Sequence, residues 1–162
     1  MSLKLVIFDL DDTLYDRWGQ LDETYGNLPN IKLFPDALQL LNAIKVPKVL
    51  ISKGDPEIQQ KKIDVLGIRP FFEEICVCAS PEEKQALFTR LMEKYAITDP
   101  KEIAVIGDRL DSEIRYGKLA GFITIRLVHG KYKDLKPRDA FEVPDYTIRE
   151  LKEVLGIIRS LL

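Results

Sequence analysis

Residues 6–16 read VIFDLDDTLYD, so an apolar run is followed at once by four acids within eleven positions. The β-branched and aromatic residues that open this stretch predict a buried strand. Carboxylates repel one another, and acids placed directly behind such a strand therefore need a compensating charge. A bound divalent cation together with a phosphate ester would make use of this crowding.

The rest of the chain alternates short apolar runs with amphipathic segments. Strands are expected at residues 4–8, 48–52, 73–78, 102–107 and 122–127. Helices are expected at residues 35–44, 55–67, 80–96 and 112–121, and residues 145–162 add a short strand and a closing helix. This alternation predicts a three-layer, doubly wound α/β domain with a parallel sheet covered on both faces.

Residues at the helix ends agree with this interpretation. Asp55 and Ser80, each followed by proline, are expected to be N-caps, and Glu83 would complete a capping box with Ser80. Gly67 and Gly121 are expected to end two of the helices.

The composition is that of one ordinary globular domain. The chain has 162 residues, of which 46% are hydrophobic and 31% charged, and its net charge is -2. This balance gives no support for broad attraction to nucleic acid or anionic lipid. The first residues lack the features of a signal peptide and no apolar run reaches the roughly 18 residues of a membrane span, so a cytoplasmic protein is expected. Cys76 and Cys78 are too few for a zinc site and are expected to be reduced core residues.

Polar residues follow the first, second and fourth predicted strands. They are Asp9, Asp11 and Thr13, then Ser52 and Lys53, then Asp108 and Glu113. Ligands of open parallel sheets bind beyond the carboxyl ends of the strands, which would gather these residues at one edge. Their carboxylate oxygens suit Mg²⁺, which retains waters and accepts an oxygen from a substrate phosphate.

With Lys84 in the third helical segment, these residues resemble the four motifs of the haloacid dehalogenase superfamily. The motifs are DLDDT at residues 9–13, the strand-terminal Ser52, the lysine, and GDRLDSE at residues 107–113. The resemblance covers nearly the whole chain. It implies a Mg²⁺-dependent phosphomonoesterase that forms an aspartyl-phosphate.

The resemblance also implies a role for each matching residue. Asp9 would attack the phosphorus and Asp11 would protonate the leaving oxygen and then activate water. The catalytic residues would be Asp9, Asp11 and Lys84. The phosphate would be bound by Thr13, Ser52 and Lys53, and the metal by Asp9, the backbone carbonyl of Asp11, Asp108 and Glu113. Asp11 argues against the carbon-halogen hydrolases of the superfamily, which lack an acid at that place.

Two departures leave alternatives open. Lys53 stands where the family often shows asparagine, so either Lys84 or Lys53 could be the main phosphate clamp. Glu113 replaces the commoner aspartate, and it could bind the metal directly or through water.

The chain offers little material for a cap. Only a flap at about residues 14–33 fits, so residues 1–162 are expected to form one hydrolase domain with little or no cap. Tyr15 and Trp18 could contact substrate or pack under that flap, and His129 is expected to be a surface loop residue without a partner. The expected partner is a phosphorylated small molecule, with a phosphoprotein and a homo-oligomer left open and nucleic acid and membrane disfavoured. The alternative function is a non-catalytic phosphate-sensing or protein-interaction module on the same fold.

Overall fold

A computed structural model describes residues 2–161 and contains one six-stranded sheet. The strands are β1 (Leu5–Phe8), β2 (Lys48–Lys53), β3 (Glu74–Cys78), β4 (Ile103–Gly107), β5 (Ile123–Leu127) and β6 (Tyr146–Ile148). All neighbouring strands pair in parallel, in the order β3-β2-β1-β4-β5-β6. The predicted doubly wound fold is confirmed, and the direction of strand order reverses between β1 and β4.

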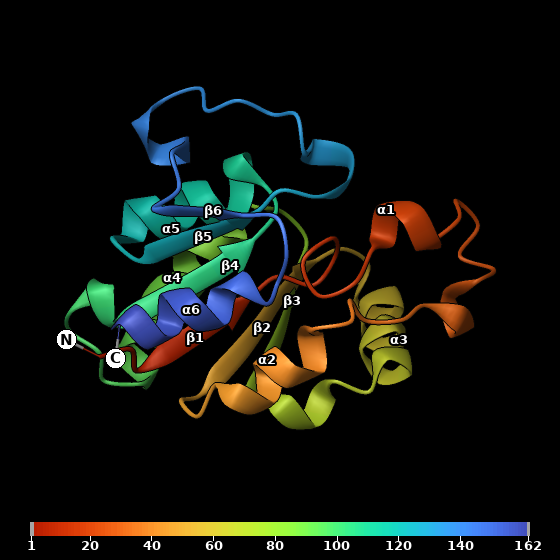
Figure 1. Cartoon of the computed structure of the whole chain (residues 1–162), viewed down its shortest axis with the longest axis horizontal. Helices are drawn as coiled ribbons and strands as arrows, with labels where there is room; N and C mark the ends of the chain where they lie inside the picture. The colour runs from red at the N-terminus through yellow and green to blue at the C-terminus, as the bar shows by residue number, and fades with distance from the viewer. Residues whose placement is uncertain (1, 162) are drawn as a thin grey trace.

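Helices cover both faces of this sheet. They are α2 (Ala37–Ala43), α3 (Pro56–Leu66), α4 (Glu83–Lys94), α5 (Arg115–Ala120) and α6 (Glu153–Leu161). Figure 1 shows α2 and α6 in front of the sheet and α4 and α5 behind it. Side chains of a strand alternate between the faces, so Val6 and Phe8 pack in the cluster with α2, α3 and α6, while Leu5 and Ile7 pack with α4. This burial on both faces explains why the central strands are apolar throughout.

The predicted helix cap residues are confirmed except at Ser80. Asp55 caps α3 by accepting a hydrogen bond from the Ile58 amide at 3.1 Å, and Gly67 ends that helix with a φ of 67°. The capping box predicted at Ser80 is wrong, since α4 begins at Glu83 and Glu82 occupies the N-cap. The Glu83 carboxylate instead accepts from the Ala79 amide at 3.0 Å, which is the first amide beyond β3.

Short elements fill the connections at the carboxyl ends of the strands. Between β1 and α2 lie α1 (Arg17–Gln20) and η1 (Leu28–Asn30), and a bridge between Tyr15 and Leu33 joins the two ends of this segment. The other short elements are η2 (Arg69–Phe71), η3 (Pro100–Glu102), the π-helical turn η4 (Leu110–Ile114), η5 (Gly130–Tyr132) and η6 (Ala140–Glu142). In Figure 1 the segment with α1 projects at the opposite end of the molecule from the labelled termini.

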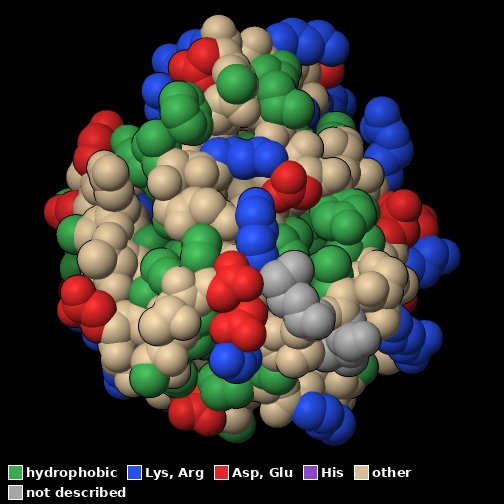
Figure 2. Space-filling view, turned by 90° about the vertical axis from the view of Figure 1, so that its left-hand side faces the viewer, with side chains coloured by type: hydrophobic (Ala, Val, Ile, Leu, Met, Phe, Trp, Pro, Cys, Tyr) green, Lys and Arg blue, Asp and Glu red, His purple; other side chains and the backbone are tan. Residues whose placement is uncertain are grey.

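The side of the molecule away from α1 is shown in Figure 2, where hydrophobic side chains are interspersed with charged ones. Within residues 2–161, none of the helices combines the length and the apolar character that crossing a membrane requires.

Candidate active site

Three buried carboxylates meet where β1 and β4 end. Asp9 follows β1, Asp108 follows β4, and Glu113 lies in the turn η4. The backbone amide of Asp9 donates to the Ile106 carbonyl at 3.0 Å, which ties the two strand ends together. Each of the three acids offers an oxygen within 4.8 Å of the others, and we call this group the floor cluster.

The floor cluster carries more negative charge than its surroundings neutralise. Burial and the nearby Glu113 raise the pKa of Asp9 to about 8, and burial and Asp9 raise the pKa of Asp108. Lys84 of α4 is the cation beside it: its Nζ lies 3.9 Å from Asp9 Oδ1 and pairs with Glu113 Oε1. Burial lowers the pKa of Lys84, but Glu113 and Asp9 raise it overall. Three hard oxygen donors against one ammonium fit a site for a divalent cation.

Asp11 faces a different set of partners. Its Oδ1 accepts from Tyr15 Oη at 2.5 Å and from Lys62 Nζ at 2.9 Å, and its Oδ2 accepts from Gln59 Nε2 at 3.1 Å. Its side chain remains 24% exposed and lines the cavity above Asp9. These three donors occupy three of the roughly four lone-pair positions of the carboxylate, which fixes the side chain at the cavity wall and leaves one position on Oδ2 for a proton.

The two predicted hydroxyl ligands are fully buried behind the cavity. Thr13 Oγ1 donates to Asp9 Oδ2 at 3.2 Å, and Ser52 Oγ accepts from Gln59 Nε2 at 2.5 Å. Lys53 is exposed and lines the cavity.

A cavity of about 290 Å³ opens above the floor cluster. Its lining includes side chains that sequence reasoning missed, namely Arg17, Arg109, Lys131 and Tyr132. Arg109 binds Asp111 through two contacts of 2.9 Å and lies 4.3 Å from the centroid of the Tyr132 ring. Because Arg109 directly follows Asp108, the sequence could have predicted that it lies at the site. The positions of Arg17, Lys131 and Tyr132 depend on how the loops pack. Of the two aromatics of the flap, Tyr15 is buried and Trp18, 55% exposed, lines the cavity.

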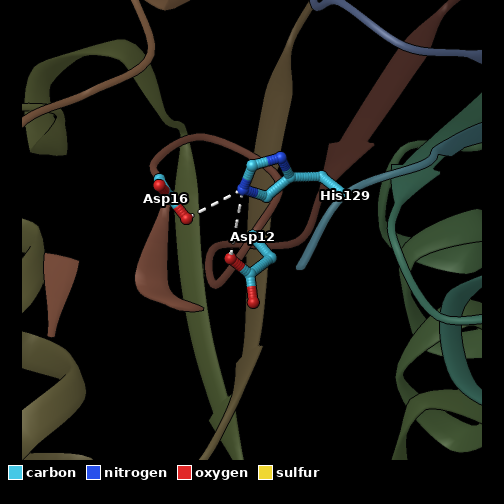
Figure 3. Close-up of side chains that lie close together, drawn as sticks. All are labelled: Asp12, Asp16 and His129. Atoms are coloured by element: carbon cyan, nitrogen blue, oxygen red, sulfur yellow. Dashed lines mark hydrogen bonds and ion pairs between the residues drawn. The ribbon is translucent and has the colours of Figure 1, made fainter. Parts of the chain in front are cut away.

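A second cluster, formed by Asp12, Asp16 and His129, lies at the edge of this region, and we call it the rim cluster (Figure 3). The expectation that His129 lacks a partner is wrong, because its Nε2 lies 2.8 Å from Asp16 Oδ1 and 3.7 Å from Asp12 Oδ1. The ring of Phe34 packs against the imidazole with centroids 5.0 Å apart. Gly130 follows with a φ of +80°, and a Cβ there would lie 2.6 Å from the Asp12 carboxylate.

Comparisons with known proteins show the family of the chain. A family model for haloacid dehalogenase-like hydrolases matches residues 17–121. The chain is 30% identical over 137 residues to a glyceraldehyde 3-phosphate phosphatase of Methanopyrus kandleri, a match that covers 81% of this chain and 58% of the relative. It is 32% identical over 149 residues to the enzyme of that name from Methanocaldococcus jannaschii, covering 85% and 62%. The chain thus spans less than two thirds of the length of these relatives.

The fold also has close counterparts among solved structures. The putative hydrolase YfnB from Bacillus subtilis, solved with bound magnesium, superimposes with a TM-score of 0.75 at 19% identity, covering 98% of this chain and 99% of that one. A predicted phosphoglycolate phosphatase from Haemophilus somnus superimposes with a TM-score of 0.79 at 19% identity, covering 97% and 98%.

Proposed function

The chain belongs to the haloacid dehalogenase-like hydrolase family, and from this premise we propose that it is a Mg²⁺-dependent phosphomonoesterase with Asp9 as its nucleophile. The observation that carries the proposal is the floor cluster. Asp9 lines the cavity beside two further buried acids and the buried Lys84. The phosphatase names of both archaeal relatives support the same reaction class.

The reaction proceeds in two displacements at phosphorus. An Asp9 oxygen forms a bond to phosphorus while the bond to the ester oxygen breaks, and the leaving oxygen takes a proton from Asp11. Asp11, now a carboxylate, removes a proton from water, whose oxygen attacks the aspartyl-phosphate. The bond from phosphorus to the Asp9 oxygen breaks, which releases phosphate and restores both acids.

The residues of the floor cluster fit a magnesium ion. Asp9, Asp108, Glu113 and the backbone carbonyl of Asp11 would hold it. When bound, the ion neutralises these acids and polarises the phosphoryl oxygens. Lys84 already pairs with Glu113, so we assign to Glu113 a double role in holding both the lysine and the metal.

We assign the main phosphate clamp to Lys84, because its buried ammonium lies beside the nucleophile whereas Lys53 is an exposed residue of the cavity wall. Ser52 is buried behind the cavity, so we assign it a supporting role: its oxygen accepts from Gln59 Nε2, which also donates to Asp11 Oδ2. Thr13 acts on the same site by orienting Asp9.

The cavity size favours a phosphorylated small molecule. We propose that residues 14–33 serve as a short flap on a single hydrolase domain, because Arg17 and Trp18 from this segment line the cavity. A volume of about 290 Å³ is at the lower end of the range for small-molecule sites. A sugar phosphate or phosphorylated acid therefore fits better than a folded phosphoprotein.

The test is release of phosphate from p-nitrophenyl phosphate by the purified chain. Turnover is expected with Mg²⁺. It should disappear with a chelator and in Asp9→Asn, and only a small residual rate should remain in Asp11→Asn. Thermal unfolding of each variant shows whether it is folded. Turnover that persists in Asp9→Asn, or that does not respond to the chelator, would contradict the proposal. A folded, Mg²⁺-binding chain without turnover on any phosphate ester would favour a phosphate-sensing module.

A further inference from the structure

A buried lysine on α3 has no part in the mechanism above. Lys62 is 2% exposed, and its Nζ lies 2.9 Å from Asp11 Oδ1. The rings of Tyr15 and Tyr25 flank the ammonium, with centroids 6.0 and 5.7 Å away. Within residues 2–161, Asp11 provides the only carboxylate within ion-pair distance of Lys62.

Stability alone is a poor reason to keep a lysine at this position. Removing an ammonium from water costs several kcal/mol, and an apolar residue of similar volume commonly gives equal or better stability. Methionine would fill the same space between the two tyrosines. The charge of Lys62 is therefore best explained by what it does to Asp11.

Helix α3 presents two donors to the same carboxylate. Gln59 and Lys62 are three residues apart and so lie on one face of the helix. Gln59 holds Asp11 Oδ2, and Lys62 holds Oδ1 together with the Tyr15 hydroxyl. With both oxygens held, the Asp11 side chain is fixed at the wall of the cavity, beside the floor cluster.

We propose that Lys62 is a positioning residue that holds Asp11 where it can reach the leaving oxygen of the substrate. The inference rests on the proposed function, because Asp11 is the acid in that mechanism. Lys62 itself is not among the residues that line the cavity, so it is proposed to act through Asp11.

The need for a well-placed acid depends on the leaving group. p-Nitrophenolate is stable as an anion and departs without a proton. Phenol resembles the tyrosine side chain, with a pKa of about 10, so phenolate needs protonation as it leaves. Since kcat/KM covers the steps up to departure of the leaving group, this constant for phenyl phosphate should depend on Asp11 more strongly than that for p-nitrophenyl phosphate.

The experiment measures kcat/KM for both esters in the wild type, Lys62→Met and Lys62→Arg, in the full chain with Mg²⁺. For Lys62→Met we expect a loss of about 10- to 100-fold with phenyl phosphate and of less than about threefold with p-nitrophenyl phosphate. Lys62→Arg should recover part of the loss. If Lys62→Met does not fold, Lys62→Gln gives the same comparison. Equal losses on both esters would overturn the inference, because a structural defect acts on both alike.

A double-variant cycle adds a second readout. In the Asp11→Asn background, Lys62→Met should change phenyl phosphate turnover by less than about threefold, because a positioning residue acts only through its partner. A further large loss would overturn the inference. Asp9→Asn separates the two proposals: activity in that variant contradicts the proposed function, whereas an inactive Asp9→Asn with equal losses in Lys62→Met contradicts only the role of Lys62.

Discussion

The floor cluster and the rim cluster each consist of three side chains that could bind a metal, but they differ in how the charge of their carboxylates is compensated. Each brings three potential metal ligands within 4.8 Å of one another. The floor cluster is buried and purely acidic, and one lysine leaves it with excess negative charge. In the rim cluster the acids face a histidine, and two of the three members are only partly buried. The excess buried charge therefore supports a metal at the floor cluster more strongly than the proximity of the ligands alone.

Local hydrogen bonds from backbone amides further compensate the negative charge of the rim cluster. Asp16 caps α1 by accepting from the Gly19 amide at 2.8 Å, and Asp12 accepts from the Trp18 amide at 3.0 Å. His129, from the loop after β5, joins these two acids. The rim cluster thus ties the segment containing α1 to a distant loop, which is a structural role.

The largest expected difference between the clusters is in catalysis. Asp9→Asn should lower phosphate release on the order of 10⁴-fold or more, because it removes the proposed nucleophile. Asp16→Asn keeps a capping side chain at the rim and should lower the rate less than about tenfold. Steady-state turnover of p-nitrophenyl phosphate measures both. Comparable losses in the two variants would remove the distinction between the clusters.

The second largest difference is expected in how variants of the two clusters change the affinity of the chain for Mg²⁺. Loss of a residue that hydrogen-bonds to a metal ligand typically weakens metal binding by roughly 10- to 100-fold. Asp108→Asn would remove a ligand itself, so it is expected to weaken Mg²⁺ binding by at least that factor. His129→Gln should leave the affinity within about threefold. Calorimetric titration of Mg²⁺ into each variant gives the two constants. A stronger effect of His129→Gln would place the cation at the rim.

The pH dependence of stability should change with metal. Without Mg²⁺, the pKa of Asp9 is about 8 in the folded chain, against an ordinary value of 3.8 for an aspartate in water, and the pKa of Asp108 is raised in the same direction. The folded state therefore binds more protons, and the free energy of unfolding should fall as pH rises from about 4 to about 8, by up to about 1.4 kcal/mol per pH unit for each proton.

Saturating Mg²⁺ should flatten this decline, because it holds the same acids in the ionised form. Urea unfolding in chelator and in Mg²⁺, at a series of pH values, measures the difference. Parallel pH profiles would show that the floor cluster does not bind the ion.

The smallest effect is on stability in the absence of metal, where the sign is informative. Asp108→Asn should raise the free energy of unfolding above about pH 8, where Asp9 is ionised, by about 1 kcal/mol, because it removes one charge from a repulsive buried group. Asp16→Ala should lower it by about 0.5–2 kcal/mol, since it loses the cap of α1 and the contact with His129. Thermal or urea unfolding in chelator decides the signs. Destabilisation by Asp108→Asn would mean that the floor acids are already balanced.

The sequence predicts the sheet and the acidic edge because both depend on local pattern. Apolar runs mark the strands, and the rule that ligands bind beyond parallel strands brings Asp9 and Asp108 together across about a hundred residues. The structure places Lys84 beside them, as the motif order implied. These features follow from periodicity and topology, so their prediction stays correct when the bounds of a strand or helix are wrong by a residue or two.

The sequence does not predict contacts that depend on how loops pack. His129 and Asp16 lie 113 positions apart, on segments whose approach no strand rule determines. The helical pattern of α3 indicates an amphipathic helix but does not show that Gln59 and Lys62 face Asp11. The turn before α4 similarly depends on which amide is left free after β3, so Glu83 reaches Ala79 rather than Ser80.

The most direct test of the central claim is to trap the phosphoryl group on the chain. The protein is mixed with a ³²P-labelled phosphate ester and Mg²⁺, quenched in acid within milliseconds, and counted for label that remains on the polypeptide. We expect label on the wild type, none on Asp9→Asn, and none on the wild type when a chelator replaces Mg²⁺. A wild type that releases phosphate without becoming labelled at any time, or an Asp9→Asn variant that still takes up label, would contradict the aspartyl-phosphate mechanism.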